Sequence, residues 1–185
     1  MSDKICFKIC RLSKEAQAKI DSKIEYRDKI LHFLHNDNLF RISDTGVSRR
    51  NAVYLEKVGL LKDKKTKEGW RKLNFIDGVY FDILVELRKF GMTAKKLSYL
   101  KNAFYENDSS MDAMLLAAFY GYEITLIIFE DGSGYIFDPY TLRDYEDKVF
   151  FSRARITLEL NPFINKALGL LEIPTVKVSY KRNNI

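Results

Sequence analysis

The sequence predicts an α+β protein, in which a mostly helical N-terminal part precedes a smaller part that mixes strands and helices. Apolar residues recur at helical spacing over much of residues 13–105. Beyond them, two β-rich runs flank Asp131-Gly132-Ser133-Gly134, a combination typical of a β-hairpin. The chain has 185 residues, 46% of them hydrophobic and 14% aromatic, so it can bury a real core and form one domain or two small ones.

The first 35 residues favour a short strand followed by one amphipathic helix. The run ICFKIC at 5–10 alternates apolar and other residues as a half-buried strand does. Residues 13–35 then form one helical stripe of apolar side chains, at Ile20, Ile24, Leu31 and Leu34. We expect these two elements to make up an N-terminal segment, 1–35.

A short helix is predicted to begin after Ser48, because serine is a good N-cap, and to end at Gly59, which suits the C′ position. At 100° per residue, one side of this helix carries Asn51, Ala52, Leu55 and Val58. The other side carries Arg49, Arg50, Val53, Tyr54 and Lys57. A face with three cations does not suit a protein core, so it calls for a different partner.

Two longer helices follow, over about 75–89 and 94–105. The first carries apolar residues in register at Val79, Ile83 and Leu87, and Gly91 marks its end. The second has Thr93 as its N-cap and an apolar side made of Leu97, Leu100 and Phe104. We take 36–105 as one domain, which ends at the polar turn sequence ENDSS, residues 106–110.

Residues 106–185 predict a small α+β domain. A helix at about 111–120 leads into the hairpin, and VFFSRARITLEL at 149–160 is typical of a longer strand. Asn161 and Pro162 suit the N-cap and first position of a helix that continues to about Leu171. A last strand is expected around 175–180. The ten aromatic residues between Phe119 and Phe151 suit core packing, a dimer interface or an aromatic ligand pocket.

Charge is distributed unevenly along the chain, whose net charge is +6. Residues 1–105 hold 23 Lys and Arg against 13 Asp and Glu, a net charge of +10, whereas residues 106–185 have a net charge of −4. Within 49–72 there are nine basic residues and three acidic ones. This density suits a surface that binds a polyanion such as nucleic acid, although a solvated lysine-rich surface has the same composition.

Three stretches of the sequence, in this order and spacing, resemble the DNA-binding domain of the MerR family of bacterial transcriptional regulators, a winged helix-turn-helix. They are GVSRRNAVYLEKVGLL at 46–61, Gly69-Trp70-Arg71 where the family usually has Gly-Tyr-Arg, and Leu87-Arg88-Lys89-Phe90-Gly91-Met92-Thr93 at a helix-to-helix joint. The resemblance covers residues 40–104, about a third of the chain. It implies a homodimer that binds double-stranded DNA and regulates transcription, with RNA polymerase as a further partner.

In a helix-turn-helix the second helix enters the major groove, so its outward face supplies donors to bases and phosphates. By position, Arg49 and Val53 are expected to reach base edges, and Arg50 and Lys57 to contact phosphates. The resemblance favours Tyr54 and Arg71 as backbone contacts and places a basic wing along the flanking strand. The predicted DNA-binding residues are Ser48, Arg49, Arg50, Val53, Tyr54, Lys57, Lys62, Lys64, Lys65, Lys67, Trp70, Arg71 and Lys72.

Two of these residues have structural alternatives, and the sequence departs from the family in one respect. Tyr54 could be packed under the wing, and Trp70 suits a packing anchor better than a base stacker. Members of the family continue into one long coiled-coil helix, whereas the helix after Thr93 is expected to end near Tyr105. Dimerisation must then come from the 13–35 helix or from residues 106–185. We expect the latter, so that a fragment of residues 1–105 would fold and bind DNA weakly as a monomer.

Other classes of protein receive less support. No apolar run approaches the roughly 20 residues of a membrane span, and no signal peptide is predicted, so we expect a cytoplasmic, nucleoid-associated protein. Cys6 and Cys10 suit reduced thiols, and the histidine pair His32 and His35 suits a helix surface, so no metal, cofactor or catalytic residue is predicted. Two alternatives stay open: an excisionase-like DNA-architectural or recombination accessory protein, and a small-molecule-binding protein whose small-molecule effector is unknown.

Overall fold

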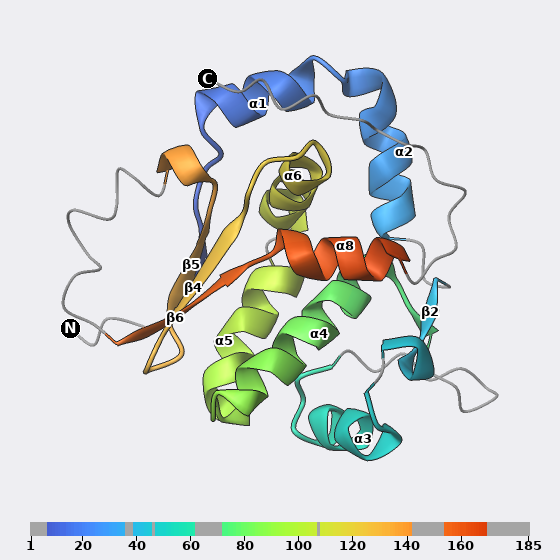
Figure 1. Cartoon of the computed structure of the whole chain (residues 1–185), viewed down its shortest axis with the longest axis vertical. Helices are drawn as coiled ribbons and strands as arrows, with labels where there is room; N and C mark the ends of the chain where they lie inside the picture. Colours follow the sequence, from blue (N-terminus) through green and yellow to red (C-terminus); the bar gives the residue numbers. More distant parts are fainter. Residues whose placement is uncertain are drawn as a thin grey trace.

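The computed structural model describes residues 7–35, 39–45, 47–61, 72–106, 108–141 and 154–169, and it has the predicted mixed α+β character. A four-stranded sheet packs on one side against a group of helices, and a small unit around helix α3 lies at the far end of those helices (Figure 1). None of the helices in these ranges is long and apolar enough to cross a membrane.

The sheet joins the two ends of the sequence. Its strands are β1 (Phe7–Ile9), β4 (Thr125–Phe129), β5 (Gly134–Phe137) and β6 (Arg155–Glu159), in the spatial order β1-β5-β4-β6. β1 pairs in parallel with β5, and the other pairs are antiparallel. Gly134 lies opposite Phe7, and a Cβ at Gly134 would collide with the Phe7 ring and with the Ile127 carbonyl oxygen. The absence of a side chain at Gly134 is therefore what lets the phenyl ring of β1 cover β5.

The hairpin and the first strand are where the sequence predicts them, and the strand predicted over 149–160 is shorter. β6 begins at Arg155, and residues 149–153 lie outside the described ranges, as does the strand predicted around 175–180. The helix predicted after Asn161 is α8 (Asn161–Gly169). Its Asn161 side chain accepts a hydrogen bond from the Ile124 amide at 2.9 Å and donates one to the Tyr122 carbonyl at 2.8 Å. These two bonds hold the start of α8 against the start of β4.

The single helix predicted over residues 13–35 is wrong, because the structure has two helices, α1 (Lys14–Asp21) and α2 (Ile24–Leu34). The Ser22 hydroxyl donates to the Lys19 carbonyl at 2.8 Å, and the Lys23 amide donates to the Ile20 carbonyl at 3.0 Å. Such bonds compete with the regular helical ladder and let the chain bend. Both helices pack against α6 (Asp108–Phe119).

Helices α4 (Phe75–Lys89) and α5 (Ala94–Tyr105) confirm the two predicted helices. The start of α4 is fixed by a capping box, in which the Asp77 amide donates to Asn74 Oδ1 at 2.7 Å and the Asn74 amide donates to Asp77 Oδ2 at 3.1 Å. The Thr93 side chain caps α5, as predicted. All but four side chains of α4 are buried, so this helix is a central element of the core rather than a surface helix.

One hydrophobic core contains residues from all three predicted segments. It includes Phe7 and Ile20 from the first segment, Leu55 and Leu97 from the second, and Leu115 from the third. Helix α5 packs against both β1 and α6, so the predicted boundary at 106–110 lies between two helices that contact each other. The main core of the described part of the chain therefore extends across that boundary, and a second, smaller cluster of Ile127, Phe129 and Phe137 lies on β4 and β5.

Candidate nucleic-acid interface

The unit that carries the predicted DNA-binding residues begins with a short two-stranded ribbon. β2 (Phe40–Arg41) pairs antiparallel with β3 (Lys72–Leu73), which places Phe40 opposite Leu73 and Arg41 opposite Lys72. A 3₁₀ turn, η1 (Ile42–Thr45), follows β2 and leads to α3 (Arg49–Lys57). Phe40 and Leu73 are buried, so the ribbon is anchored on its inner side and presents its basic residues outward.

Helix α3 begins and ends as the sequence predicts. The Ser48 side chain accepts a hydrogen bond from the Asn51 amide at 3.2 Å, which confirms Ser48 as the N-cap. At the other end, Gly59 has φ +74°, the Leu60 amide donates to the Leu55 carbonyl at 2.9 Å, and the Gly59 amide donates to the Glu56 carbonyl at 2.8 Å. This pair of bonds is a Schellman motif, which needs a left-handed residue at Gly59.

A lysine on α5 also secures the end of α3. Lys101 Nζ donates to the Gly59 carbonyl oxygen at 2.6 Å, and Leu60 and Leu61 are buried directly after the turn. A cation at this point interacts favourably with the C-terminal end of the helix. The orientation of α3 is therefore set from both the helical core and the turn, which leaves its outer face fixed relative to the rest of the protein.

The two faces of α3 have the predicted characters, with two exceptions. Ala52 and Leu55 are buried, whereas Asn51 and Val58, which were predicted on the same side, are exposed. The buried stripe of α3 is thus narrower than predicted and consists of Ala52 and Leu55. On the outer face, Arg49, Arg50 and Lys57 are exposed, and so are Val53 (55%) and Tyr54 (41%). Ser48 is exposed beside them. An exposed valine and tyrosine among three cations make a surface that is both apolar and positive.

The Tyr54 ring contacts a residue that the sequence analysis did not select. The Arg88 guanidinium lies over this ring at 5.3 Å from its centroid, and Arg88 Nη1 donates to the Met92 carbonyl at 3.1 Å. Cation–π contact of this kind orients both side chains. Arg88 belongs to the Leu87–Thr93 joint that supported the family resemblance, and that motif was the signal available for it. The alternative in which Tyr54 packs under a wing concerns residues 62–71, which lie outside the described ranges.

Six predicted site residues are in that undescribed stretch, namely Lys62, Lys64, Lys65, Lys67, Trp70 and Arg71. Lys72 is described, is exposed, and lies directly opposite the exposed Arg41. Two cations at directly opposite positions of an antiparallel pair repel each other. Arg41 is thus a second basic residue that the sequence analysis missed, and only the pairing of β2 with β3 brings it to the site.

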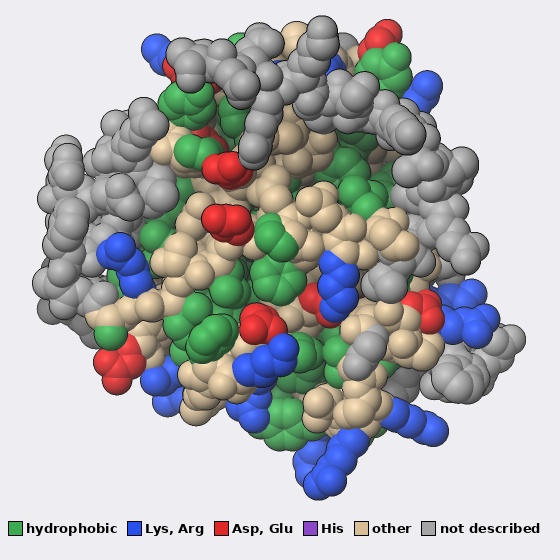
Figure 2. All heavy atoms as spheres, viewed as in Figure 1, with side chains coloured by type: hydrophobic (Ala, Val, Ile, Leu, Met, Phe, Trp, Pro, Cys, Tyr) green, Lys and Arg blue, Asp and Glu red, His purple; other side chains and the backbone are tan. Residues whose placement is uncertain are grey.

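Basic side chains gather over this end of the molecule. Figure 2 shows Lys and Arg side chains projecting from the edge that α3 occupies in Figure 1. Among the described residues of β2, η1, α3 and β3 there are five cations against two acids, and one of those acids, Asp44, accepts a hydrogen bond from the Arg41 amide at 2.7 Å. The basic residues are Arg41, Arg49, Arg50, Lys57 and Lys72. A cluster of this kind provides the positive potential that a polyanion requires.

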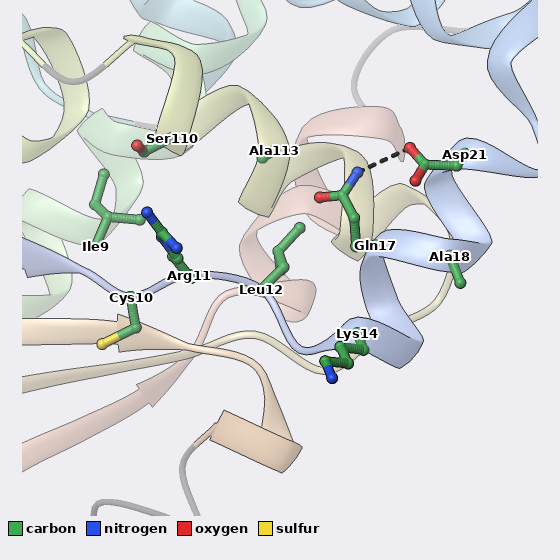
Figure 3. Close-up of a pocket in the computed structure, with 10 residues that line it drawn as sticks. All are labelled: Ile9, Cys10, Arg11, Leu12, Lys14, Gln17, Ala18, Asp21, Ser110 and Ala113. Atoms are coloured by element: carbon green, nitrogen blue, oxygen red, sulfur yellow. Dashed lines mark hydrogen bonds between the residues drawn. The ribbon is translucent and has the colours of Figure 1, made fainter.

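A second candidate site is a hollow of about 530 Å³ between the β1–α1 connection and the start of α6. Figure 3 shows the Arg11 side chain extending from the exit of β1 toward Ser110, while Gln17 Nε2 donates to Asp21 Oδ1 at 2.9 Å. Ile9 and Leu12 supply apolar lining. A hollow of this size, with a guanidinium and apolar walls, suits a small ligand that carries an acidic group.

The described residues offer little that would support metal or thiol chemistry. They contain no group of three or more His, Cys, Asp or Glu side chains placed to hold a metal ion. Burial raises the pKa of the Cys10 thiol to about 11, with a further rise from Asp138 that Lys8 opposes. Cys10 is therefore a protonated thiol at neutral pH and a poor nucleophile. His35 Nε2 lies 2.9 Å from Asp112 Oδ1, a contact that ties the end of α2 to α6.

Comparison of the chain with protein-family models, with curated proteins and with solved structures found no match. The features of the chain that indicate a function are therefore its own: the basic outer face of α3, the Arg41–Lys72 ribbon, and the contacts that hold them in place.

Proposed function

We propose that this protein is a sequence-specific, double-stranded-DNA-binding transcriptional regulator that acts as a homodimer, and that residues 40–104 form a MerR-like winged helix-turn-helix. The observation that carries the proposal is that α3 has one buried apolar side and one exposed basic side. Its inner residues Ala52 and Leu55 are buried, while its outer face presents three cations beside exposed Val53 and Tyr54. A recognition helix requires this combination, because its outer face must reach phosphates and base edges while the inner face packs on the domain.

The β2–β3 ribbon supports the same proposal by an independent route. Arg41 and Lys72 are exposed and directly opposite each other, an arrangement that costs free energy in the isolated protein. A phosphate between or beside them would replace that repulsion with attraction. The turn η1 contacts both the ribbon strand β2 and α3, so the DNA backbone next to the groove that α3 enters would pass over the ribbon.

Individual roles follow from position along α3. Arg49, near the start of the helix, is proposed to contact guanine, and Val53, one turn later, the methyl group of thymine. Arg50 and Lys57 are proposed to contact phosphates. The Tyr54 hydroxyl would bind a phosphate from a ring that Arg88 orients. A regulator of this kind would act in the cytoplasm, at the nucleoid, with RNA polymerase as a further partner.

The affinity of this protein for DNA is expected to depend on salt concentration. The protein is expected to bind duplex DNA with an affinity that falls steeply between about 50 and 200 mM salt, because each phosphate contact releases a counterion. Replacing Arg49, Arg50 and Lys57 together with alanine is expected to lower the slope of log K against log salt by roughly 2, about one for each of the two phosphate contacts that Arg50 and Lys57 would make. Fluorescence anisotropy with a labelled duplex measures both slopes.

The matched control for this experiment is Lys29→Ala, which removes an exposed lysine of α2, a helix separate from α3 in Figure 1. It is expected to leave the slope close to that of the wild type. An affinity that does not change with salt, or a triple variant that binds as the wild type does, would contradict the proposal.

A second prediction separates base contacts from phosphate contacts on α3. Arg49→Ala is expected to cost about 1–3 kcal/mol on the selected target sequence and much less on random DNA, if Arg49 makes a bidentate contact to guanine. Arg50→Ala, its exposed neighbour, is expected to weaken both complexes by a similar factor. The target is obtained first by selection from a random duplex library. Equal losses on both DNAs for Arg49→Ala would place that residue on the backbone instead.

Two other functions compete with this one. An excisionase-like architectural protein would use the same α3 face. The DNA target distinguishes the two functions: repeated sites near a recombination site indicate an excisionase-like protein, and one palindrome near a promoter indicates a regulator. A small-molecule-binding protein is favoured by the 530 Å³ hollow next to Arg11. If the protein binds no duplex DNA at low salt, the small-molecule-binding function is favoured over both DNA-binding functions.

A further inference from the structure

The sheet ends at β6, to which no other described strand is paired on its outer side. The direction of its backbone groups follows from the bond that the Leu160 amide donates to the Ile124 carbonyl at 2.8 Å. Because amide and carbonyl groups alternate in direction along an antiparallel strand, those of Ile156 and Leu158 point toward β4. Those of Arg155, Thr157 and Glu159 point to the outer edge. The amide and carbonyl groups of every second residue of β6 are therefore directed outward.

The sequence of β6, Arg155-Ile156-Thr157-Leu158-Glu159, is complementary to itself when a second copy runs antiparallel to it. With a two-fold axis through Thr157, Arg155 lies opposite Glu159 of the second copy, and Ile156 lies opposite Leu158 of the second copy. Thr157 then lies opposite its own equivalent. The three outward-pointing residues are those that would exchange backbone hydrogen bonds in this register, and cross-strand pairs of opposite charge and of apolar side chains are both favourable.

Side-chain exposure agrees with this register. Arg155, Thr157 and Glu159 are exposed on one face of β6, while Ile156 and Leu158 are only half-buried on the face that packs toward the helices. Next to Ile156 there is a hollow of about 240 Å³, whose lining includes Phe90, and Phe90 is 59% exposed. A second copy paired along β6 would cover this apolar surface as well as the two half-buried side chains.

We propose that β6 is a dimer interface, where two copies of this chain pair antiparallel about Thr157 and join their sheets into one. The proposal deepens the homodimer part of the proposed function and depends on it only in expecting a dimer. A continuous sheet across two copies also removes the β6 edge, which would otherwise be open to pairing with other chains. The Arg155–Glu159 pairs select the antiparallel register, because a parallel pairing would bring like charges together.

The opposite edge of the sheet does not offer the same interface. β1 has three residues, and the exposed Lys8 is at its centre. Antiparallel self-pairing about that residue would bring two lysine side chains directly opposite each other, which is destabilising. A short edge strand with an exposed lysine is typical of an edge that avoids pairing. Of the two sheet edges among the described strands, β6 is therefore the one suited to a second copy.

The test is a charge swap in the full chain, measured by sedimentation equilibrium without DNA. The wild type is expected to sediment as a dimer. Glu159→Arg places arginine opposite arginine at both ends of the interface and is expected to raise the dissociation constant at least about tenfold. The double variant Arg155→Glu/Glu159→Arg restores opposite charges in the same register and is expected to recover a dimer close to the wild type.

The control variant is Asp28→Arg, a charge reversal at another exposed acidic residue, on α2, which is expected to leave the dimer unchanged. Circular dichroism of Glu159→Arg shows whether the variant is folded, and recovery in the double variant excludes a loss caused by unfolding. A monomeric wild type, a Glu159→Arg dimer as stable as the wild type, or a double variant that stays monomeric would each overturn the proposal. Because no DNA is present, any of these outcomes leaves the DNA-binding result unaffected.

Discussion

A chain truncated after Tyr105 is expected to be unfolded, even though it retains every described residue of the candidate DNA-binding surface. The deletion removes β5, the strand that pairs with β1, and α6, the helix against which α1, α2 and α5 pack. Leu97 and Phe104 on α5 would lose their cover, as would Ile20 on α1. Uncovering a large apolar side chain costs about 1.5–3 kcal/mol, so these three together cost about 5–9 kcal/mol, a loss comparable with the 5–15 kcal/mol that stabilise a typical domain.

Circular dichroism and thermal unfolding of the fragment 1–105 measure this outcome. The matched control is the same chain divided at the same place, with 1–105 and 106–185 expressed together, which is expected to assemble because the break lies between α5 and α6 and leaves every element intact. The sequence alone leads to the opposite expectation, a folded monomeric fragment. A cooperative unfolding transition in 1–105 alone would contradict this prediction. It would show that the part of the core within 1–105 is stable without residues 106–185.

The features that the sequence predicts well are those encoded within one turn of helix. Ser48 and Thr93 cap α3 and α5 through bonds to amides three residues later, and Gly59 and Gly91 both have positive φ where a helix ends. Such features depend on neighbours along the chain and are visible without knowledge of the fold. The exposed face of α3 follows in the same way, because its periodicity is fixed once the ends of the helix are known.

The features that the sequence does not predict depend on residues far apart along the chain. The apolar stripe of 13–35 is continuous, and the bonds of Ser22 and Lys23, together with the position of α6, divide it into two helices. The parallel pairing of β1 with β5 joins Phe7 to Gly134 and has no signal in either segment alone. A strand of three residues can pair at many places, and its partner is chosen by the shape of the finished core.

The candidate site likewise contains residues that the sequence predicts and residues that only the fold brings to it. The cations of α3 are predicted because they share one helix face, whereas Arg41 and Arg88 come to the site from β2 and α4. Lys101, which bonds to Gly59, comes from α5. These three residues position or extend the surface rather than form its centre. A sequence motif identifies the centre of such a surface more readily than the residues that hold it in place, since the latter are selected by geometry.

The contact that joins the start of α1 to the sheet is the buried carboxylate of Asp138, just after β5. Its Oδ2 accepts hydrogen bonds from the Ser13 amide at 2.8 Å and the Thr141 hydroxyl at 2.9 Å, and its Oδ1 accepts one from the Tyr140 amide at 3.0 Å. Burial alone raises the pKa of Asp138, but the bonds from Ser13, Thr141 and Tyr140 outweigh it, so the pKa lies below the ordinary value of 3.8. The ionised carboxylate is therefore the form that the fold favours.

Asp138→Ala is expected to lower the free energy of unfolding by about 3 kcal/mol at neutral pH, since it removes bonds to a charged group and leaves buried donors without an acceptor. A lowered pKa contributes stability that is present above the unfolded-state value and is lost as pH falls through the folded-state value. The difference between wild type and variant should therefore be constant from neutral pH down to about pH 5 and shrink below about pH 4. Urea unfolding at a series of pH values measures it. Asp21→Ala, which removes an exposed carboxylate from the end of α1, is the matched control and is expected to change the free energy by less than about 0.5 kcal/mol. A difference for Asp138→Ala that is small at neutral pH, or that grows in acid, would mean that the carboxylate does not hold α1 to the sheet.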